Sequence, residues 1–284
     1  MNKSNRILSN RRLNSHKGDY GHVFILAGSA GLTGAAYLTS QASLLSGSGL
    51  VTLGIPKSLN SIMEVKLTEV MTKPLAETKD LTLSLRAFWQ IRSTLAQFDA
   101  LAIGPGLSEH PETKKLVHKL LSSLSKPLVL DADGINALVG NLKVLNKVKV
   151  ELIITPHPGE MARLLNLKVA QIQKNRSKIA KDFAKKYKLV VVLKGHRSVV
   201  ANRAGEIYIN KTGNPGMASG GCGDVLTGII TSFLGQGISP FLAAKLAVYV
   251  HGLAADIAVK ENGEISLIAT DILDKLPQAL KKAI

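Results

Sequence analysis

The sequence predicts an α/β fold with a central, mostly parallel sheet covered by helices on both faces. Short, continuously apolar segments typical of strands alternate with longer segments whose apolar residues recur at helical spacing. Strands that are apolar throughout are buried on both sides, as in parallel sheets between helices. Because no internal repeat, low-complexity segment or linker divides the 284 residues, we expect a single domain.

The expected strands are apolar runs that end at glycine, proline or a polar residue. They are residues 22–27, 50–55, 99–103, 127–130, 152–155 and 189–193, followed by a hairpin of 198–201 and 206–209. The expected helices are 35–46, 84–98, 111–124, 169–187, 224–234, 240–260 and 270–282. Helix 84–98 is expected to bury Trp89 with its apolar neighbours. Residues 57–83 show no clear pattern, so we expect a partly ordered surface insertion there.

The composition narrows the class of protein. The single cysteine, Cys222, excludes an internal disulfide and fits a reducing compartment. We find neither an apolar run as long as a membrane span nor a secretory signal, so a cytoplasmic protein is expected. The formal net charge of +16 is spread over a basic N-terminal arm (residues 1–14), the run 143–149 and the helix 174–188. Aromatic residues make up only 4% of the chain and do not alternate with the basic residues of these segments, so we do not expect nucleic-acid binding.

The stretch 214–228, read as NPGMASGGCGDVLTG, joins a glycine-rich loop to a helix. Gly221 and Gly223 supply backbone that can approach a ligand closely. Free N–H groups and the helix dipole make such a helix start an anion site. A carboxylate at this place, Asp224, suits a site that takes a proton from a hydroxyl while it holds a phosphoryl group. The stretch by itself leaves open the alternative that Asp224 is an N-cap.

Further unusual residues follow the expected strands at their carboxyl ends, where open α/β sheets bind ligands. Each has an ordinary explanation as a turn residue, a helix cap or a solvated charge. Their coincidence on one rim predicts a ligand site with many backbone donors and several carboxylates, which suits phosphoryl transfer on a nucleotide-bearing substrate. These residues are the turns 28–31 and 104–106, then Asp131, Asp133, His157, Lys194 and Gly195.

The common alternative motifs are missing from the sequence. There is no GxxxxGK[ST], and the glycines at 28–34 do not have the GxGxxG spacing of a dinucleotide-binding turn. There is no HExxH or cysteine–histidine cluster for zinc, and no GxSxG for a serine hydrolase. The sequence therefore disfavours a nicotinamide-dependent dehydrogenase, a zinc hydrolase and a serine hydrolase.

In several stretches taken together, the chain resembles the ribokinase-like superfamily and, within it, the ADP/ATP-dependent NAD(P)H-hydrate dehydratase family. The resemblance covers about residues 10–280. GGxGD marks only the superfamily, whereas the other stretches together are more specific. The stretches are SHKGDYGHVFILAGSAGLTGAA (15–36), AIGPGL (102–107), LVLDADGINAL (128–138), TPHPGEMARLL (155–165), VVLKG (191–195) and GNPGMASGGCGDVLTG (213–228).

The resemblance implies a repair reaction and a role for each matching residue. The family uses ADP or ATP to phosphorylate the hydroxyl of hydrated NADH or NADPH, after which phosphate leaves and the ring double bond returns. Asp224 matches the catalytic aspartate, which serves as the base and contacts the hydrated nicotinamide. The remaining matches are the anion hole (Gly221, Cys222, Gly223), the nucleotide site (Lys194, Gly195, His196, Arg197, Ser198, Gly223), the contacts to the hydrated dinucleotide (Ala35, Gly106, His157) and weaker candidates for Mg²⁺ through water or for shaping the site (Asp131, Asp133, Asn136, Glu160).

Cys222 departs from the family pattern, in which threonine or serine is commoner. A thiol is a poorer hydrogen-bond donor than a hydroxyl, so the change matters little if the backbone N–H binds the anion. Because a helix N-terminus can lower the pKa of a thiol, Cys222 is also a candidate for oxidation.

The resemblance further implies Mg²⁺, ADP in preference to ATP, a homotetramer, and a separate epimerase acting upstream, since the chain has no room for a fused epimerase domain. Two alternatives remain. A ribokinase-like kinase of a small alcohol or vitamin precursor would share the GGxGD site but keep the phosphate on its product. A non-catalytic nucleotide-binding or nucleic-acid-binding protein would have no need of Asp224.

Overall fold

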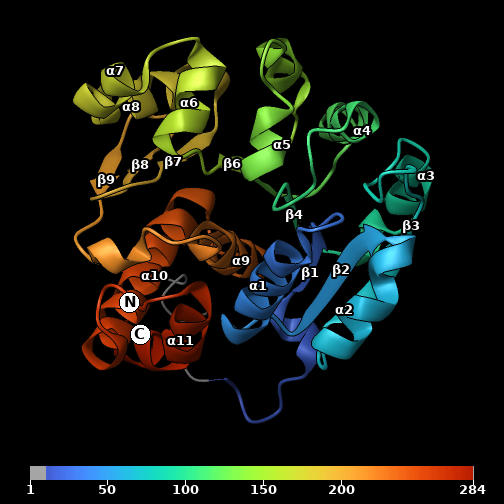
Figure 1. Ribbon diagram of the computed structural model, residues 1–284, viewed down its shortest axis with the longest axis horizontal. Coiled ribbons are helices and arrows are strands. Elements are labelled where there is room, and N and C mark those ends of the chain that lie inside the picture. The colour runs from blue at the N-terminus through green and yellow to red at the C-terminus, as the bar shows by residue number, and fades with distance from the viewer. Residues whose placement is uncertain (1–10, 284) are drawn as a thin grey trace.

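The computed structural model describes residues 11–283, and one nine-stranded sheet runs through it (Figure 1). The strand order is β3-β2-β1-β4-β5-β6-β7-β8-β9. Strands β1 to β7 pair in parallel, whereas β8 and β9 are antiparallel. The strands are β1 (His22–Leu26), β2 (Leu50–Pro56), β3 (Met71–Leu75), β4 (Ala100–Ile103), β5 (Leu128–Leu130), β6 (Leu152–Ile154), β7 (Val190–Leu193), β8 (Val199–Ala201) and β9 (Ile207–Ile209).

Helices cover both faces of this sheet, as Figure 1 shows. Successive residues of a strand point to opposite faces, so Val23 and Ile25 of β1 pack into one core and Phe24 and Leu26 into the other. The first core is covered by α1 (Thr33–Leu45), α2 (Asn60–Lys66), α9 (Cys222–Gly235), α10 (Pro240–Asn262) and α11 (Ala269–Ala283). The second is covered by α3 (Ala87–Arg92), α4 (Pro111–Leu121), α5 (Ala132–Asn136), α6 (Pro158–Leu165), α7 (Val169–Lys174) and α8 (Arg176–Tyr187).

The region 57–83 is ordered, and the expectation of a partly ordered insertion is wrong. It contains the short 3-10 helix η3 (Lys57–Leu59), α2 and the edge strand β3, which pairs in parallel with β2. Met63 and Leu75 of this region are buried in opposite cores. Only Leu75 of β3 is buried, which explains why no apolar run marks the strand.

Two expected helices are shorter or broken. Region 84–98 holds only α3 and the 3-10 helix η4 (Leu95–Gln97), and Trp89 is 66% exposed rather than buried. Region 169–187 is two helices, because Asn175 lies between them with non-helical backbone angles. The remaining 3-10 helices are η2 (Lys17–Tyr20), η5 (Leu142–Lys147) and η6 (Pro215–Met217).

α9 lies unusually close to α1, because small residues line their contact. A Cβ on Gly228 would lie 2.3 Å from the carbonyl oxygen of Thr39. The Ser43 hydroxyl donates to the Gly228 carbonyl over 2.9 Å. This close packing fixes the N-terminus of α9 above the carboxyl ends of the strands.

α10 is long and apolar enough, by length and composition, to cross a membrane. It is also a core helix, since 61% of its most apolar window is buried, and it packs on α9 and α11. The length and composition of α10 are therefore not evidence that it spans a membrane.

The basic arm expected at residues 1–14 lies mostly outside the described residues. Within the described part, the Arg11 guanidinium donates to the Gly47 carbonyl (2.9 Å) and lies 4.1 Å from the centre of the Tyr20 ring.

Candidate active site

The N-terminus of α9 is built from the glycine-rich stretch. Gly221 is the N-cap, with a φ of 90° that favours glycine. The helix begins at Cys222, two residues earlier than expected, so Asp224 occupies its third position and is not an N-cap. The N–H groups of Asp224 and Val225 donate to the Gly221 carbonyl at 3.0 and 3.2 Å. Those of Cys222 and Gly223 reach no backbone carbonyl within residues 11–283, which leaves them available to an anion.

The carboxylate of Asp224 lies beside these free donors and is itself without a hydrogen-bond partner in the described part of the chain. Burial raises its pKa to about 7, and the negative charges of Asp131, Asp133 and Glu160 add to the shift, while Lys194 opposes it. A carboxylate with a pKa near neutrality can both take up and release a proton under physiological conditions.

A cluster in which both oxygens of a buried carboxylate accept hydrogen bonds lies beneath the turn, and we call it the Asp131 cluster (Asp131, Thr155, Lys194 and Thr227). Asp131 is 1% exposed. Its Oδ1 accepts from the Lys194 ammonium (2.7 Å) and the Thr155 hydroxyl (2.6 Å), and its Oδ2 accepts from the Thr227 hydroxyl (2.7 Å). Asp131, Thr155 and Lys194 directly follow β5, β6 and β7, and Thr227 lies in α9. The cluster therefore connects the sheet to the helix.

Lys194 carries its charge to the base of the glycine turn. Burial lowers the pKa of Lys194, but attraction by Asp131 and Glu160 outweighs it and the net pKa is raised. Its Nζ lies 3.3 Å from the position that a Cβ on Gly223 would occupy. Because residue 223 has no side chain, the Lys194 ammonium can lie close to the N-terminus of α9. Its positive charge there adds to that of the helix dipole.

His157 and Glu160 form a capping box at the start of α6. The His157 N–H donates to Glu160 Oε2 (2.7 Å), and His157 Nδ1 accepts from the Gly159 N–H (2.9 Å). Burial, with Lys194 and Arg163 nearby, lowers the pKa of His157, so its ring is neutral with Nε2 protonated. Nε2 lies 3.5 Å from Glu160 Oε1, and Glu160 Oε2 lies 3.9 Å from Lys194 Nζ. The capping box thus joins His157 to the same charge network as Asp224.

Ala35 and Gly106 are brought together at the start of α1. A Cβ on Gly106 would lie 3.1 Å from the Ala35 Cβ, and the Gly106 carbonyl accepts from the Ser29 hydroxyl (2.8 Å). One turn further along α1, the Leu38 side chain would contact a Cβ on Gly221. The expected dinucleotide contacts therefore lie next to the glycine turn, as one site requires.

The segment Lys194–Ser198 leaves β7 and is held from behind by Arg176. The Arg176 guanidinium donates to the carbonyls of Leu193 (2.9 Å) and Lys194 (3.1 Å), and also to that of His196. His196 and Arg197 are exposed. The segment is thus fixed at its base while its tip stays open to a ligand.

Asp133 and Asn136 hold loops in place. Asp133 Oδ2 accepts from the Ser108 N–H (2.8 Å), and Asp133 Oδ1 accepts from the Asn136 amide (3.2 Å). Asn136 Oδ1 accepts from the Arg163 guanidinium (2.9 Å). No group of three or more metal-binding side chains occurs within residues 11–283. With Asp131 engaged as well, these carboxylates do not form a metal cage.

Cys222 is buried, and burial raises the pKa of its thiol, contrary to the expectation of a lowered value. Its Sγ lies 3.3 Å from the Ser219 hydroxyl. The structure thus gives no support to Cys222 as an oxidation-prone thiol, because the reactive form is the thiolate.

His251 of α10 lies beside the Cys222 backbone, and only 7% of it is exposed. Its Nε2 is buried with no hydrogen-bond partner of normal geometry in the described residues. Burial lowers its pKa to about 4, so the ring is neutral. The Cys222 backbone lies close enough to raise the pKa of the ring, which partly offsets the effect of burial.

Sequence reasoning missed Thr155, Arg176, Thr227 and His251. Thr155 and Thr227 stand inside the recognised stretches, and their burial beside Asp131 could have been suspected from their positions after β6 and one turn into α9. Arg176 and His251 carry no local signal, because their helices meet the site only through the fold.

Comparisons with known proteins show which family the chain resembles. A family model described as NAD(P)H-hydrate dehydratase matches residues 23–278. The bifunctional NAD(P)H-hydrate repair enzyme Nnr of Moorella thermoacetica is 47% identical over 274 residues, 96% of this chain and 52% of that protein. The chain thus spans about half the length of the curated relatives that it matches first.

Two further relatives are matched over most of their own length. The ADP-dependent (S)-NAD(P)H-hydrate dehydratase of Neisseria meningitidis is 36% identical, over 92% of this chain and 86% of that protein. The crystal structure of an ADP/ATP-dependent NAD(P)H-hydrate dehydratase from Bacillus subtilis, co-crystallised with ATP and Mg²⁺, has a TM-score of 0.83 at 31% identity, covering 99% and 98% of the two chains. The expected α/β fold of the ribokinase-like type is confirmed.

Proposed function

The chain belongs to the NAD(P)H-hydrate dehydratase family, and on this premise we propose that it uses ADP or ATP to dehydrate hydrated NADH and NADPH. One observation supports this most strongly. An unpartnered carboxylate with a pKa of about 7 lies beside free backbone donors at a helix N-terminus. The reaction needs a base and an anion site in contact with each other, and here they lie within three consecutive residues.

In the proposed first step, Asp224 takes the proton of the substrate hydroxyl. The hydroxyl oxygen then forms a bond to the terminal phosphorus of the nucleotide, and the bond from that phosphorus to its bridging oxygen breaks. A nucleotide shorter by one phosphate leaves. The raised pKa of Asp224 makes it a stronger base than an ordinary aspartate, which suits a hydroxyl proton.

In the proposed second step, the C–O bond between the ring carbon and the phosphorylated oxygen breaks, and phosphate leaves with the electron pair. The lone pair of the ring nitrogen drives the departure, and loss of a proton from the neighbouring carbon restores the ring double bond. Phosphate is a far better leaving group than hydroxide, which is why the nucleotide is needed. The N–H groups of Cys222 and Gly223 and the Lys194 ammonium supply the positive field for the phosphoryl group in both steps.

The other site residues receive binding roles in this proposal. Gly195, His196, Arg197 and Ser198 hold the nucleotide together with Lys194 and Gly223. Ala35, Gly106 and His157 contact the hydrated dinucleotide. Arg176 acts indirectly, by fixing the nucleotide segment through three carbonyl groups.

A magnesium ion would fit this site as a companion of the nucleotide phosphates. Mg²⁺ keeps several of its waters and binds through one or two carboxylates plus substrate phosphates. Asp224 accepts no hydrogen bond from the described residues and Glu160 accepts one, from the His157 N–H, whereas both oxygens of Asp131 and both oxygens of Asp133 accept hydrogen bonds. We assign Glu160 and Asp224 to the ion through water, where it would offset phosphate charge.

The remaining features of the proposal come from the resemblance. They are ADP in preference to ATP, a homotetramer, a cytoplasmic location, one domain, and a separate epimerase that supplies the correct epimer of the hydrate.

The decisive experiment follows the absorbance of the reduced nicotinamide ring with hydrated NADH, Mg²⁺ and either ADP or ATP. We expect nucleotide-dependent recovery by the native protein and a loss of about a thousandfold in Asp224→Asn, which keeps the shape of the side chain but removes the base. Asp182→Asn, an exposed aspartate on α8, is the control and should leave the rate unchanged.

The products distinguish this function from the small-alcohol kinase. A dehydratase releases inorganic phosphate and restores the nicotinamide, whereas a kinase leaves a stable phosphate ester. Absence of recovery with both nucleotides would overturn the proposal. Full recovery by Asp224→Asn would keep the reaction and remove Asp224 from its role as the base.

A further inference from the structure

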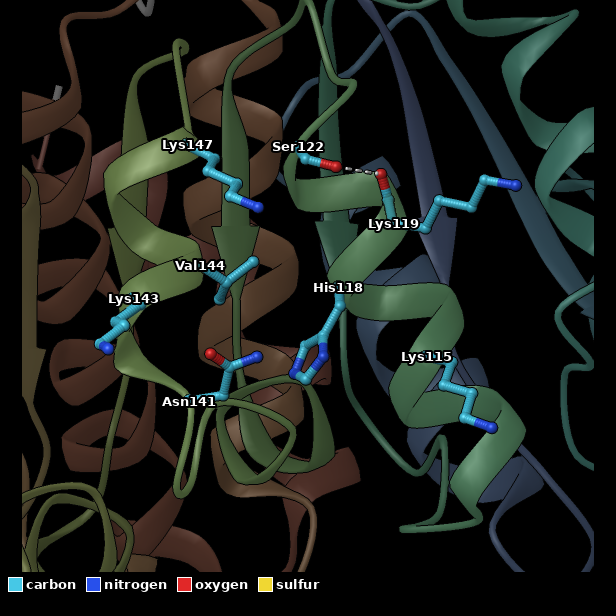
Figure 2. A pocket seen from close by; sticks show the side chains of 8 residues that line it. All are labelled: Lys115, His118, Lys119, Ser122, Asn141, Lys143, Val144 and Lys147. Atoms are coloured by element: carbon cyan, nitrogen blue, oxygen red, sulfur yellow. Dashed lines mark hydrogen bonds between the residues drawn. The ribbon is translucent and has the colours of Figure 1, made fainter.

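A second charged region lies between α4 and η5, away from the residues assigned to the reaction. It is a cavity of about 510 Å³ (Figure 2). Four lysines line it, two from each side: Lys115 and Lys119 from α4, Lys143 and Lys147 from η5. We call this region the lysine cleft.

The topology separates the lysine cleft from the proposed active site. α4 ends at Leu121 and the chain then enters the amino end of β5, while η5 leads into the amino end of β6. Asp224, Asp131 and Lys194 all lie at the opposite, carboxyl ends of the strands. The dehydratase reaction therefore gives these lysines no role, and the basic run 143–149 is unexplained by it.

The lysine cleft carries four positive charges that nothing in its wall neutralises. No carboxylate is among the residues that line it in the described part of the chain, and none of the four lysines forms an ion pair there. The other lining groups are neutral hydrogen-bonding or small side chains, among them Ser122 and Asn141. Like charges gathered around one hollow repel one another and attract a multiply charged anion.

Such repulsion predicts ammonium groups turned away from the hollow, and every lysine that lines it except Lys147 is turned away. Figure 2 shows Lys147 reaching from η5 towards α4, while Lys115 and Lys143 extend outward. The Lys119 ammonium lies instead over two aromatic rings, 4.1 Å from the centre of Phe88 and 5.2 Å from that of Trp89. Long flexible lysine stems can swing inward once an anion offsets their repulsion.

The floor of the lysine cleft is fixed, unlike its rim. His118 Nε2 donates to the Ala137 carbonyl over 2.6 Å, which joins the middle of α4 to the segment that follows α5. Val144 is buried between them. The His118 hydrogen bond therefore fixes α4 relative to the segment that follows α5, on which the wall of the hollow depends.

We propose that the lysine cleft binds a small molecule with two or more linked phosphates. Inorganic polyphosphate and the phosphate tail of a nucleotide share this chemistry, and the experiment below distinguishes them. Nucleic acid is a poorer fit because no Phe, Tyr or Trp side chain lines the hollow in the described part of the chain.

Trp89 makes the proposal directly testable, since it is the only tryptophan of the chain. Its fluorescence reports on Lys119, which an anion in the cleft would draw off the indole ring. We expect titration with inorganic tripolyphosphate to change the Trp89 emission and to saturate. ATP should give the same change if the phosphate tail is recognised, and adenosine should give none. If tripolyphosphate acts and ATP does not, the ligand is free polyphosphate.

The double variant Lys143→Gln/Lys147→Gln removes half of the charge from exposed positions and should weaken tripolyphosphate binding by at least about tenfold. Lys281→Gln/Lys282→Gln makes the same change of charge at exposed positions of α11 and should bind like the native protein. Both variants should keep the dehydratase rate, because none of these lysines lies in the proposed active site.

Three results would overturn the proposal. The first is no saturable change with tripolyphosphate. The second is an equal weakening in both double variants, which would show diffuse attraction by the net charge. The third is tight binding of RNA with none of tripolyphosphate, which would show that the lysine cleft is part of an extended nucleic-acid surface.

Discussion

The Asp131 cluster and the turn at the start of α9 lie against each other but differ in hydrogen bonding. The carboxylate of the cluster is paired with donors, whereas several polar groups of the turn are unpaired within residues 11–283. In the cluster, the three donors from Lys194, Thr155 and Thr227 satisfy both oxygens of Asp131. In the turn, two N–H groups and the Asp224 carboxylate have no partner among the described residues. Since burying a polar group without a hydrogen bond is costly, the cluster stabilises the fold, while the turn retains unsatisfied groups that a ligand can engage.

The largest expected effect comes from breaking the cluster. Lys194→Met should lower the free energy of unfolding by about 3–5 kcal/mol, because it leaves the buried charge of Asp131 without its cation. Asp131→Asn combined with Lys194→Met should recover much of that loss, since neither charge then remains. Urea unfolding measures both, with Lys281→Met on the surface of α11 as the control. A single variant as stable as the native protein would show that Lys194 does not stabilise the cluster.

The turn should respond to pH through Asp224. Its pKa is about 7 in the fold against 3.8 ordinarily, so the folded state binds this proton more tightly than the unfolded chain. The resulting stabilisation is complete below the lower value and is lost as the pH rises to about 7, by up to about 4 kcal/mol and less where solvent reaches the carboxylate. Asp224→Asn should remove this loss, which urea unfolding between pH 4 and 8 would measure.

Activity should change with pH in the opposite direction, because the proposed base works only when it is ionised. The rate should therefore rise through a pH of about 7. A rate that is flat across this range, together with unchanged stability of Asp224→Asn, would contradict the raised pKa.

His251 should produce a smaller effect on the acid side. Its pKa is lowered by burial from 6.5 to about 4, so the stabilisation it gives is present above 6.5 and is lost as the pH falls towards 4. The loss is expected to reach about 3 kcal/mol. His251→Gln should reduce this acid sensitivity, whereas His196→Gln, at an exposed position, should not. Equal acid sensitivity of the native protein and His251→Gln would assign the loss to other groups.

The sequence predicted those elements whose burial is visible in local apolar patterns. Continuous apolar runs identified most parallel strands, because strands buried on both faces need apolar residues throughout. The edge strand β3 was not predicted, because Leu75 is its only buried residue and no apolar run marks it. The break at Asn175 was missed because Ile172 and Ile179 keep a helical spacing across it. The expected burial of Trp89 was wrong, because that side chain faces solvent.

For the site, glycine turns and strand ends were visible because their spacing is local. The hydrogen-bond partners of the carboxylates could not be predicted from the sequence. Asp131 was proposed as a metal candidate, yet its oxygens are occupied by residues 24, 63 and 96 positions away. Which carboxylate is satisfied and which is left free depends on such distant contacts, and only the fold supplies them.

The smallest expected effect concerns Cys222, and it tests whether the turn acts through backbone alone. The thiol lies 3.3 Å from the Ser219 hydroxyl and is buried, so it is turned away from solvent, whereas the Cys222 N–H is free. If the N–H binds the phosphoryl group, Cys222→Ser should change the dehydratase rate by less than about threefold, which is below the effect of losing one oxyanion donor. Steady-state rates measure this, with Cys222→Ala as the companion variant. A loss of about a hundredfold in Cys222→Ala, restored in Cys222→Ser, would show instead that a side-chain donor at this position completes the anion site.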